Sequence, residues 1–155
     1  MKRLFKPQFY QLIEGHMRLV ISELHPGNRE MIPFYYWDIL VDDEFVGRIC
    51  LRVGYNYHSY YNGNVGYEIA PRYRGHGYAA AACRMILPVA RAHGMDYLIL
   101  SCAESNVASA KTIERIGGRY LETVAVPADY FAYYEGIEDR RIYKLPLDLR
   151  ERNTQ

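Results

Sequence analysis

The segment PRYRGHGYAAAA, residues 71–82, combines glycines, arginines and a run of alanines. Gly75 and Gly77 leave the backbone bare at a turn, Arg72 and Arg74 add positive charge, and the alanines predict a helix directly afterwards. The start of a helix presents unpaired amide N–H groups and about half a positive charge. The segment therefore predicts an anion-binding loop, with phosphate or pyrophosphate as its natural ligand.

Three phosphate-binding patterns compete for this loop. Gly75, Gly77 and Ala80 match the dinucleotide pattern GxGxxG/A, but that pattern belongs in a series of strand–helix–strand units, and only one such unit is indicated here. The Walker pattern is absent, because no Gly-Lys-Ser/Thr follows. The third pattern, Arg/Gln-x-x-Gly-x-Gly/Ala, is met by Arg72, Gly75 and Gly77.

The loop must be positioned by the elements around it. Apolar and polar residues alternate in MRLVISEL (17–24), and β-branched and aromatic residues fill FYYWDILV (34–41). With residues 42–44 as a turn, 34–41 and 45–53 form an antiparallel hairpin. Residues 54–64 have the composition of a loop. Further strands are predicted at 65–71, 97–102, 119–126 and 140–147, and helices at 77–93 and 106–118.

This order of elements predicts a mixed α+β fold of the α/β type. The unit from 65 to 102 is a right-handed parallel strand–helix–strand unit, flanked by antiparallel hairpins. We therefore expect one mixed central sheet with helices on its faces.

Composition limits the classes of function. A chain of 155 residues suits a single domain, and a formal charge of +1 gives no general attraction to nucleic acid or membrane. The N-terminus lacks the apolar stretch of a signal peptide, and no membrane-spanning run is present. Cys50, Cys83 and Cys102 lack metal-ligand or disulfide spacing, so we expect no metal and a cytoplasmic location.

Two segments together resemble a known family. VGYEIAPRYRGHGYA (65–79) and SNVASAKTIERIGG (105–118) are similar to the two signatures of the GNAT superfamily of acyl-CoA-dependent N-acetyltransferases. The resemblance covers roughly residues 17–147 and implies one GNAT-like domain over 1–155. It implies that the fourth and fifth strands, 65–71 and 97–102, are parallel and splayed, with the pantetheine arm of acetyl-CoA between them.

The resemblance also implies which residues hold the cosubstrate. Backbone groups of Ile69 and Ala70 would pair with the pantetheine, and the amide of Ile69 would face the thioester oxygen. Asn106 and Ser109 would contact the pantetheine or its phosphate end. The amides of the loop would hold the pyrophosphate; these belong to Arg74, Gly75, His76, Gly77, Tyr78 and Ala79.

The base and the acid are less clearly marked. Glu68 lies on the strand beside the expected thioester and is the first candidate for the base; the alternative is a solvent-facing Glu68, with His58 or solvent as the base. Ser101 and Ile113 stand where relatives carry a catalytic glutamate and tyrosine. The acid would then come from Tyr130, with Tyr133 and Tyr134 as alternatives, or the thiolate would leave unassisted.

Relatives place two helices between the first two strands, where this chain has only about nine residues, 25–33. The acceptor face is therefore expected to be open and lined by tyrosines, or closed by a second subunit in a homodimer. The tyrosines concerned are Tyr55, Tyr57, Tyr60 and Tyr61. The predicted activity is transfer of an acetyl group to a primary amine of a small molecule or peptide. The alternatives are a non-catalytic CoA-binding module of the same fold and a nicotinamide-binding protein.

Overall fold

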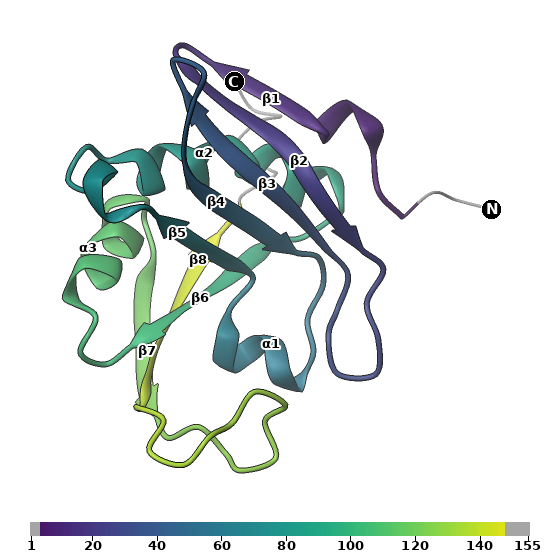
Figure 1. Ribbon diagram of the computed structural model, residues 1–155. Coiled ribbons are helices and arrows are strands. Elements are labelled where there is room, and N and C mark those ends of the chain that lie inside the picture. The colour runs from purple at the N-terminus through teal and green to yellow at the C-terminus, as the bar shows by residue number, and fades with distance from the viewer. Residues whose placement is uncertain (1–3, 148–155) are drawn as a thin grey trace.

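The chain folds into two antiparallel sheets with helices packed between and beside them (Figure 1). The computed structural model describes residues 4–147. The first sheet has the order β1 (Gln11–Glu14), β2 (Met17–His25), β3 (Phe34–Val41), β4 (Glu44–Arg52) and β5 (Val65–Ile69). The second has the order β6 (Tyr97–Ala103), β8 (Arg140–Pro146) and β7 (Arg119–Val124). The helices are α1 (Tyr57–Asn62), α2 (Tyr78–Ala92) and α3 (Val107–Arg115), with 3-10 turns at Pro7–Phe9 and Pro71–Tyr73.

The mixed α+β class and the predicted strands and long helices are confirmed, but the sheet topology differs from the prediction. Every pairing between strands in residues 4–147 is antiparallel, so the single mixed sheet is wrong. The segments 65–71 and 97–102 form no parallel pair, because β5 and β6 are edge strands of different sheets. The expected loop at 54–64 contains α1, whose N-terminus is closed by reciprocal hydrogen bonds between Asn56 and Ser59.

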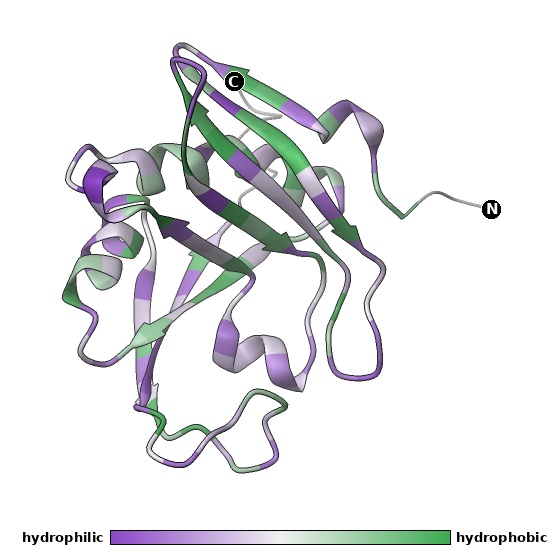
Figure 2. Cartoon of the chain, in the orientation of Figure 1, coloured by the Kyte–Doolittle hydropathy of each residue, from purple (hydrophilic) through white to green (hydrophobic). Residues whose placement is uncertain are grey.

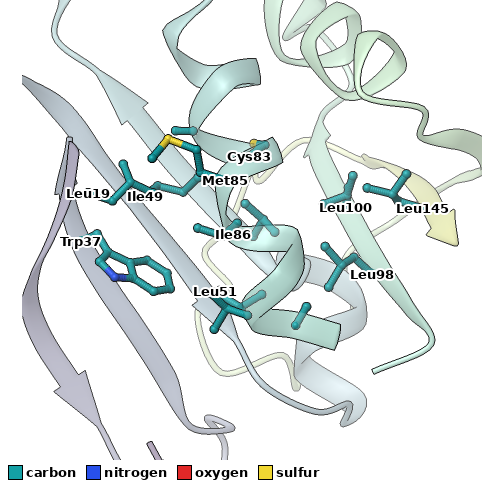
Figure 3. Packing of buried hydrophobic residues seen from close by; sticks show 14 of the residues in the cluster. Leu19, Trp37, Ile49, Leu51, Cys83, Met85, Ile86, Leu98, Leu100 and Leu145 are labelled. Atoms are coloured by element: carbon teal, nitrogen blue, oxygen red, sulfur yellow. The ribbon is translucent and has the colours of Figure 1, made fainter. Parts of the chain in front are cut away.

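Helix α2 fills the space between the two sheets (Figure 3). Trp37, Ile49 and Leu51 face it from the first sheet, and Leu98 faces it from the second. Ile86 on α2 lies between them and is fully buried. Burying each such side chain contributes about 1.5–3 kcal/mol to the free energy of folding, so α2 is fixed in position from both sides.

The β3–β4 hairpin closes through the tight turn that its sequence predicted. Asp42 and Asp43 have φ values of 50° and 67°, as the two central residues of a type I′ turn require. Asp is one of the few side chains that tolerate this region. Figure 2 shows this turn as hydrophilic beside the hydrophobic stretches of β2, β3 and β4.

Asn64 joins the two sheets at one point. Its side-chain amide donates to the carbonyls of Arg52 (3.0 Å) and Gly54 (2.8 Å), while its carbonyl oxygen accepts from the Ile99 N–H (2.9 Å). Its own N–H donates to the Ile99 carbonyl at 2.6 Å. Beyond this contact β5 and β6 share no ladder of hydrogen bonds. Asn64 is thus fully buried with its side-chain hydrogen bonds satisfied, and the gap between the two sheets begins next to it.

Candidate functional site

A cavity of about 700 Å³ lies between the edges of β5 and β6, beside the first turns of α2 and α3. Its walls bring together both segments that the sequence singled out. Predicted site residues that line it are Glu68, Ile69, Arg74, Gly75, Gly77, Tyr78, Ala79, Asn106 and Ser109. Ala70, His76 and Tyr130 are not among its lining residues.

The free edge of β5 faces the gap. Hydrogen bonds from Arg52 N–H to the Asn64 carbonyl (2.7 Å) and from Ala70 N–H to the Val46 carbonyl (2.8 Å) fix which residues bond to β4. Because backbone groups alternate in direction along a strand, those of Tyr67 and Ile69 point away from β4 and toward the cavity. The Ile69 carbonyl accepts from Arg74 Nε at 2.9 Å. The Ile69 N–H makes no hydrogen bond within residues 4–147.

The glycine loop leaves a run of donors at the start of α2. Gly75 and Gly77 have φ values of 87° and 76°, which an L side chain adopts only at a cost. Gly77 is the N-cap of α2 and supplies no side-chain acceptor. No hydrogen bond within residues 4–147 uses the backbone N–H groups of residues 76–80. These amides form a positive, anion-accepting end of the cavity.

Three cations surround this end of the cavity. Arg74 comes from the loop, and Lys111 and Arg115 come from α3. A Cβ atom built on Gly77 would lie 3.7 Å from Arg115 Nη1, so this guanidinium lies directly beside the loop. The sequence analysis missed Lys111 and Arg115. Their spacing of four residues, which places them on one face of a helix, was the signal available.

Asn106 and Ser109 line the cavity but also hold α3 in place. The Asn106 side chain caps α3 by accepting from the Ser109 N–H at 3.1 Å. Ser109 Oγ lies 2.8 Å from the hydroxyl of Tyr67, so it ties α3 to β5 across the gap. Tyr67 also lines the cavity, and burial raises the pKa of its hydroxyl.

Two predicted cofactor contacts, the backbone groups of Ala70 and the amide of Arg74, do not fit their roles. The Arg74 N–H donates to the Pro71 carbonyl at 3.3 Å. The Ala70 N–H bonds to Val46, and the Ala70 carbonyl accepts from the Tyr73 N–H at 2.8 Å, so neither backbone group is free for a ligand. The His76 side chain is exposed and stacks on Tyr78 with ring centroids 5.3 Å apart. The backbone N–H of His76, which is the group expected to hold the pyrophosphate, belongs to the run of free amides.

Glu68 is an exposed residue of β5 at the wall of the cavity. It lies opposite Arg48 in the β4–β5 register, but the Arg48 guanidinium bonds to Asp38 at 3.1 Å instead. No hydrogen bond or ion pair within residues 4–147 engages the Glu68 carboxylate. The carboxylate is therefore available to a ligand in the cavity.

Tyr130 lies in a second cavity of about 250 Å³, next to the first. Asn62, Ala103 and Arg140 line both cavities and form their shared boundary. Burial raises the pKa of Tyr130, while Arg52 and Arg140 lower it. Tyr134 also lines this second cavity, whereas Tyr133 is exposed outside it.

The two positions where relatives carry catalytic groups serve the fold here. Ile113 is buried in the core at 2% exposure. The Ser101 hydroxyl donates to the Tyr61 carbonyl at 2.7 Å. Cys102 lines the first cavity, but burial raises the pKa of its thiol, which argues against a reactive thiolate.

The clustered tyrosines join α1 and the residues before it to β6, to β7 and to the segment between β7 and β8. The hydroxyls of Tyr57 and Tyr60 donate to Asp129 and Glu122, and Tyr55 stacks on Tyr97. Of the four tyrosines expected at the acceptor face, only Tyr61 lines the second cavity. The second cavity therefore lies beside the first, and three of the four tyrosines expected at the acceptor face are not in its lining.

Neither a metal centre nor a membrane span is found in the described part of the chain. Residues 4–147 contain no group of three or more His, Cys, Asp or Glu side chains placed to hold a metal ion. No helix among these residues is long and apolar enough to cross a membrane.

Comparison with known proteins identifies the family. The model of the acetyltransferase (GNAT) domain matches residues 7–119, so the chain belongs to the GNAT acetyltransferase domain family. This confirms the resemblance drawn from the two signatures. No curated protein matches the sequence.

Solved structures share the fold at low sequence identity. A structure from Vibrio cholerae, provisionally named a ribosomal-protein-serine acetyltransferase, is 14% identical with a TM-score of 0.65, and the match covers 88% of this chain and 97% of that one. A GNAT-family acetyltransferase from Bacillus anthracis is 20% identical with a TM-score of 0.58, covering 72% and 66%. The microcin C7 self-immunity acetyltransferase MccE, solved with acetyl-CoA and AMP, is 18% identical with a TM-score of 0.56, covering 73% and 61%. The present chain thus spans less than two thirds of the length of the last two.

Proposed function

We propose that this protein transfers an acetyl group from acetyl-CoA to a primary amine by direct attack. The observation that carries the proposal is the single cavity that combines the free edge of β5, the uncapped start of α2 and three cations. These groups match the parts of acetyl-CoA. The amides of its pantetheine arm can pair with the edge of a strand, and its phosphates need N–H donors and positive charge. Bound there, acetyl-CoA would supply an acetyl group already activated as a thioester.

The backbone and the cations hold the cosubstrate in this proposal. The N–H groups of residues 76–80, with Arg74, Lys111 and Arg115, donate hydrogen bonds to the phosphates, and the free edge of β5 at Tyr67 pairs with the pantetheine arm. The unpartnered Ile69 N–H faces the negative charge that develops on the thioester oxygen. One such donor typically lowers the activation barrier by ~3 kcal/mol.

Glu68 is the proposed base. An amine of pKa ~10.4 is protonated at pH 7, and freeing it costs roughly 4.6 kcal/mol. The Glu68 carboxylate stands at the wall of the cavity with no partner inside the protein, so it can take this proton directly or through water. The amine nitrogen then bonds to the acetyl carbon, the carbon–sulfur bond breaks, and CoA leaves as a thiol once it regains a proton.

Tyr130 is the proposed source of that last proton. Its ring lies in the cavity that shares Asn62, Ala103 and Arg140 with the first one. An ordinary tyrosine carries its proton at neutral pH, as an acid must, and burial raises the pKa of Tyr130 further. The thiol of CoA is itself a modest acid, so this contribution is smaller than that of the base.

The test follows release of the CoA thiol and the mass of the acceptor together, over a panel of amines. We expect stoichiometric thiol and acetylated amine from the wild type. Glu68→Gln should lower kcat by about 10²–10⁴-fold with acetyl-CoA affinity nearly unchanged.

The rival function is a CoA-binding module without catalysis. It is favoured by Ile113 and Ser101, which occupy catalytic positions but serve the fold. If acetyl-CoA binds and no amine in the panel gains an acetyl group, this rival is correct.

A further inference from the structure

Arg140 stands at the boundary between the two cavities. It extends from β8 and lines both of them, together with Asn62 and Ala103. A group placed here contacts the space proposed for the cosubstrate and the enclosed space beside it. The functional proposal above assigns no role to this side chain.

The position of Arg140 is fixed by one edge of its guanidinium. Its Nε donates to Ser101 Oγ at 2.8 Å and more weakly to the Tyr61 carbonyl at 3.3 Å. Its two terminal amino groups make no hydrogen bond within residues 4–147, and no ion pair joins it to a carboxylate there. The two terminal amino groups, the fork with which arginine binds a carboxylate at two points, are thus held in place and have no hydrogen-bond partner within residues 4–147.

Glu138, the carboxylate that shares the second cavity, favours the charge of Arg140 electrostatically but forms no ion pair with it. Both oxygens of Glu138 accept hydrogen bonds from Ser105, from the backbone N–H at 3.1 Å and the hydroxyl at 2.9 Å. Arg140 is half-buried, and burial is the main cause that lowers its pKa. A partly buried cation without an ion-pair partner is unfavourable, so a carboxylate bound directly to its terminal amino groups would stabilise it.

The rest of the second cavity is shaped for an apolar body. Its walls carry aliphatic side chains and tyrosine rings, from Tyr61, Val126, Tyr130, Ala132, Tyr134 and Ile137. A volume of about 250 Å³ equals that of roughly eight water molecules at ~30 Å³ each. This is room for one amino-acid side chain.

We propose that the acceptor is a free α-amino acid with an apolar or aromatic side chain, whose carboxylate binds the vacant fork of Arg140. This inference rests on the acetyltransferase function proposed above and names its acceptor. The amine and the carboxylate of an α-amino acid share one carbon atom. A carboxylate on Arg140 therefore places the amine on the side of the first cavity and the side chain in the second. The N-terminal residue of a peptide has no charge at the corresponding carbonyl and leaves Arg140 unpaired.

The experiment compares L-phenylalanine with L-phenylalaninamide, and L-leucine with L-leucinamide, as acceptors for the wild type and two variants. Arg140→Gln removes the charge. Arg141→Gln is the matched control, because Arg141 is the next residue of β8, also donates through Nε to a backbone carbonyl (Glu104, 3.1 Å), and lines neither cavity. Since amides and acids differ in amine basicity, the quantity compared is the acid-to-amide ratio of kcat/KM across the three proteins.

Arg140→Gln should lower this ratio about 10–10²-fold, as expected for a lost hydrogen bond to a charged group, while Arg141→Gln leaves it unchanged. Acetyl-CoA affinity, measured by calorimetry, should be similar in all three proteins. Equal ratios in the wild type and Arg140→Gln would overturn the carboxylate site even if the amides are acetylated.

Two further measurements distinguish failure of the proposed acceptor from failure of the proposed acetyltransferase function. Thermal stabilisation of the protein by the amino acids, and not by their amides, reports the anion site without turnover. Absence of acetyl-CoA binding would overturn the proposed function itself. Preference for the amide or for a peptide in the wild type would overturn the acceptor alone. Should Arg140→Gln fail to fold, Arg140→Lys, which keeps the charge but not the fork, should still lose most of the preference.

Discussion

Replacing Gly77 by Asp tests the glycine loop more sharply than any other single change. Gly77 is the N-cap of α2, lines the first cavity and has a φ of 76°. A side chain there meets no clash, since the nearest atom to an added Cβ is Arg115 Nη1 at 3.7 Å. The substitution therefore acts through the φ value and through charge.

The expected loss of acetyl-CoA affinity has two parts. A carboxylate ~5 Å from a phosphate charge, at an effective dielectric constant of ~20, costs about 3 kcal/mol. The same carboxylate is within reach of Arg115 and would pair with it, which removes a charged hydrogen bond of ~1.5–3 kcal/mol from the ligand. Together these predict an affinity lower by about 10³–10⁴-fold.

Gly94→Asp supplies the control for the backbone. Gly94 has a φ of 77°, nothing lies within 4 Å of an added Cβ, and it does not line the cavity. Both variants should lose ~1–2 kcal/mol of stability from the left-handed conformation. Calorimetric titration with acetyl-CoA, alongside denaturant unfolding, separates the two effects. If Gly77→Asp binds acetyl-CoA within threefold of Gly94→Asp, the assignment of the phosphate site to this loop is wrong.

Three further predictions concern the fold and the acid. Asn64→Ala removes three side-chain hydrogen bonds at the join of the sheets and should destabilise the protein by ~2–4 kcal/mol in urea unfolding. A loss under ~1 kcal/mol would contradict the structural role of this side chain. Burial lowers the pKa of His93, whose Nε2 lies 2.7 Å from the Tyr35 hydroxyl. The unfolded chain therefore binds the proton first, and the free energy of unfolding should fall as the pH drops below ~6.5. His93→Gln should flatten this pH dependence, and an unchanged slope would exclude His93 as its source. Tyr130→Phe should slow single-turnover acetyl transfer more than Tyr133→Phe does, because Tyr130 lines the second cavity and Tyr133 does not. Equal rates for the two variants would mean that neither hydroxyl is the acid.

The sequence was sufficient where local chemistry decides the structure. Alternation of apolar residues placed β2 and β3, paired aspartates placed the β3–β4 turn, and Gly75 with Gly77 placed the loop before α2. Each of these is set by residues within one element or one turn. The family followed from two such local signatures, which the matching family model confirms.

Long-range pairing was beyond what local patterns convey. The strands of both sheets are apolar enough to belong to either, so nothing local shows that β5 and β6 are edges of separate sheets. The role of Asn64 depends on partners at Arg52, Gly54 and Ile99, which the sequence keeps apart. The tyrosines near 57 and near 130 were both expected near the acceptor, but only the fold shows that they pack on each other, through the contacts of His58 and Tyr61 with Tyr130.

The same limit applied to the candidate site. Ala70 matches the family's pattern in residue type, yet its two backbone groups are bonded to Val46 and Tyr73. Lys111, Arg115 and Arg140 reach the cavities from elements whose approach depends on tertiary packing. Motifs thus located the end of the site proposed for the phosphates, whereas the end proposed for the acceptor required the structure.

Calorimetric titration of the wild-type protein with acetyl-CoA and, separately, with NADH tests the central claim most directly. We predict one acetyl-CoA bound per chain, with an affinity that falls as salt rises and that Arg115→Ala weakens, and no heat of binding with NADH. Binding of NADH in place of acetyl-CoA, or acetyl-CoA binding that is indifferent to both Gly77→Asp and Arg115→Ala, would contradict the account.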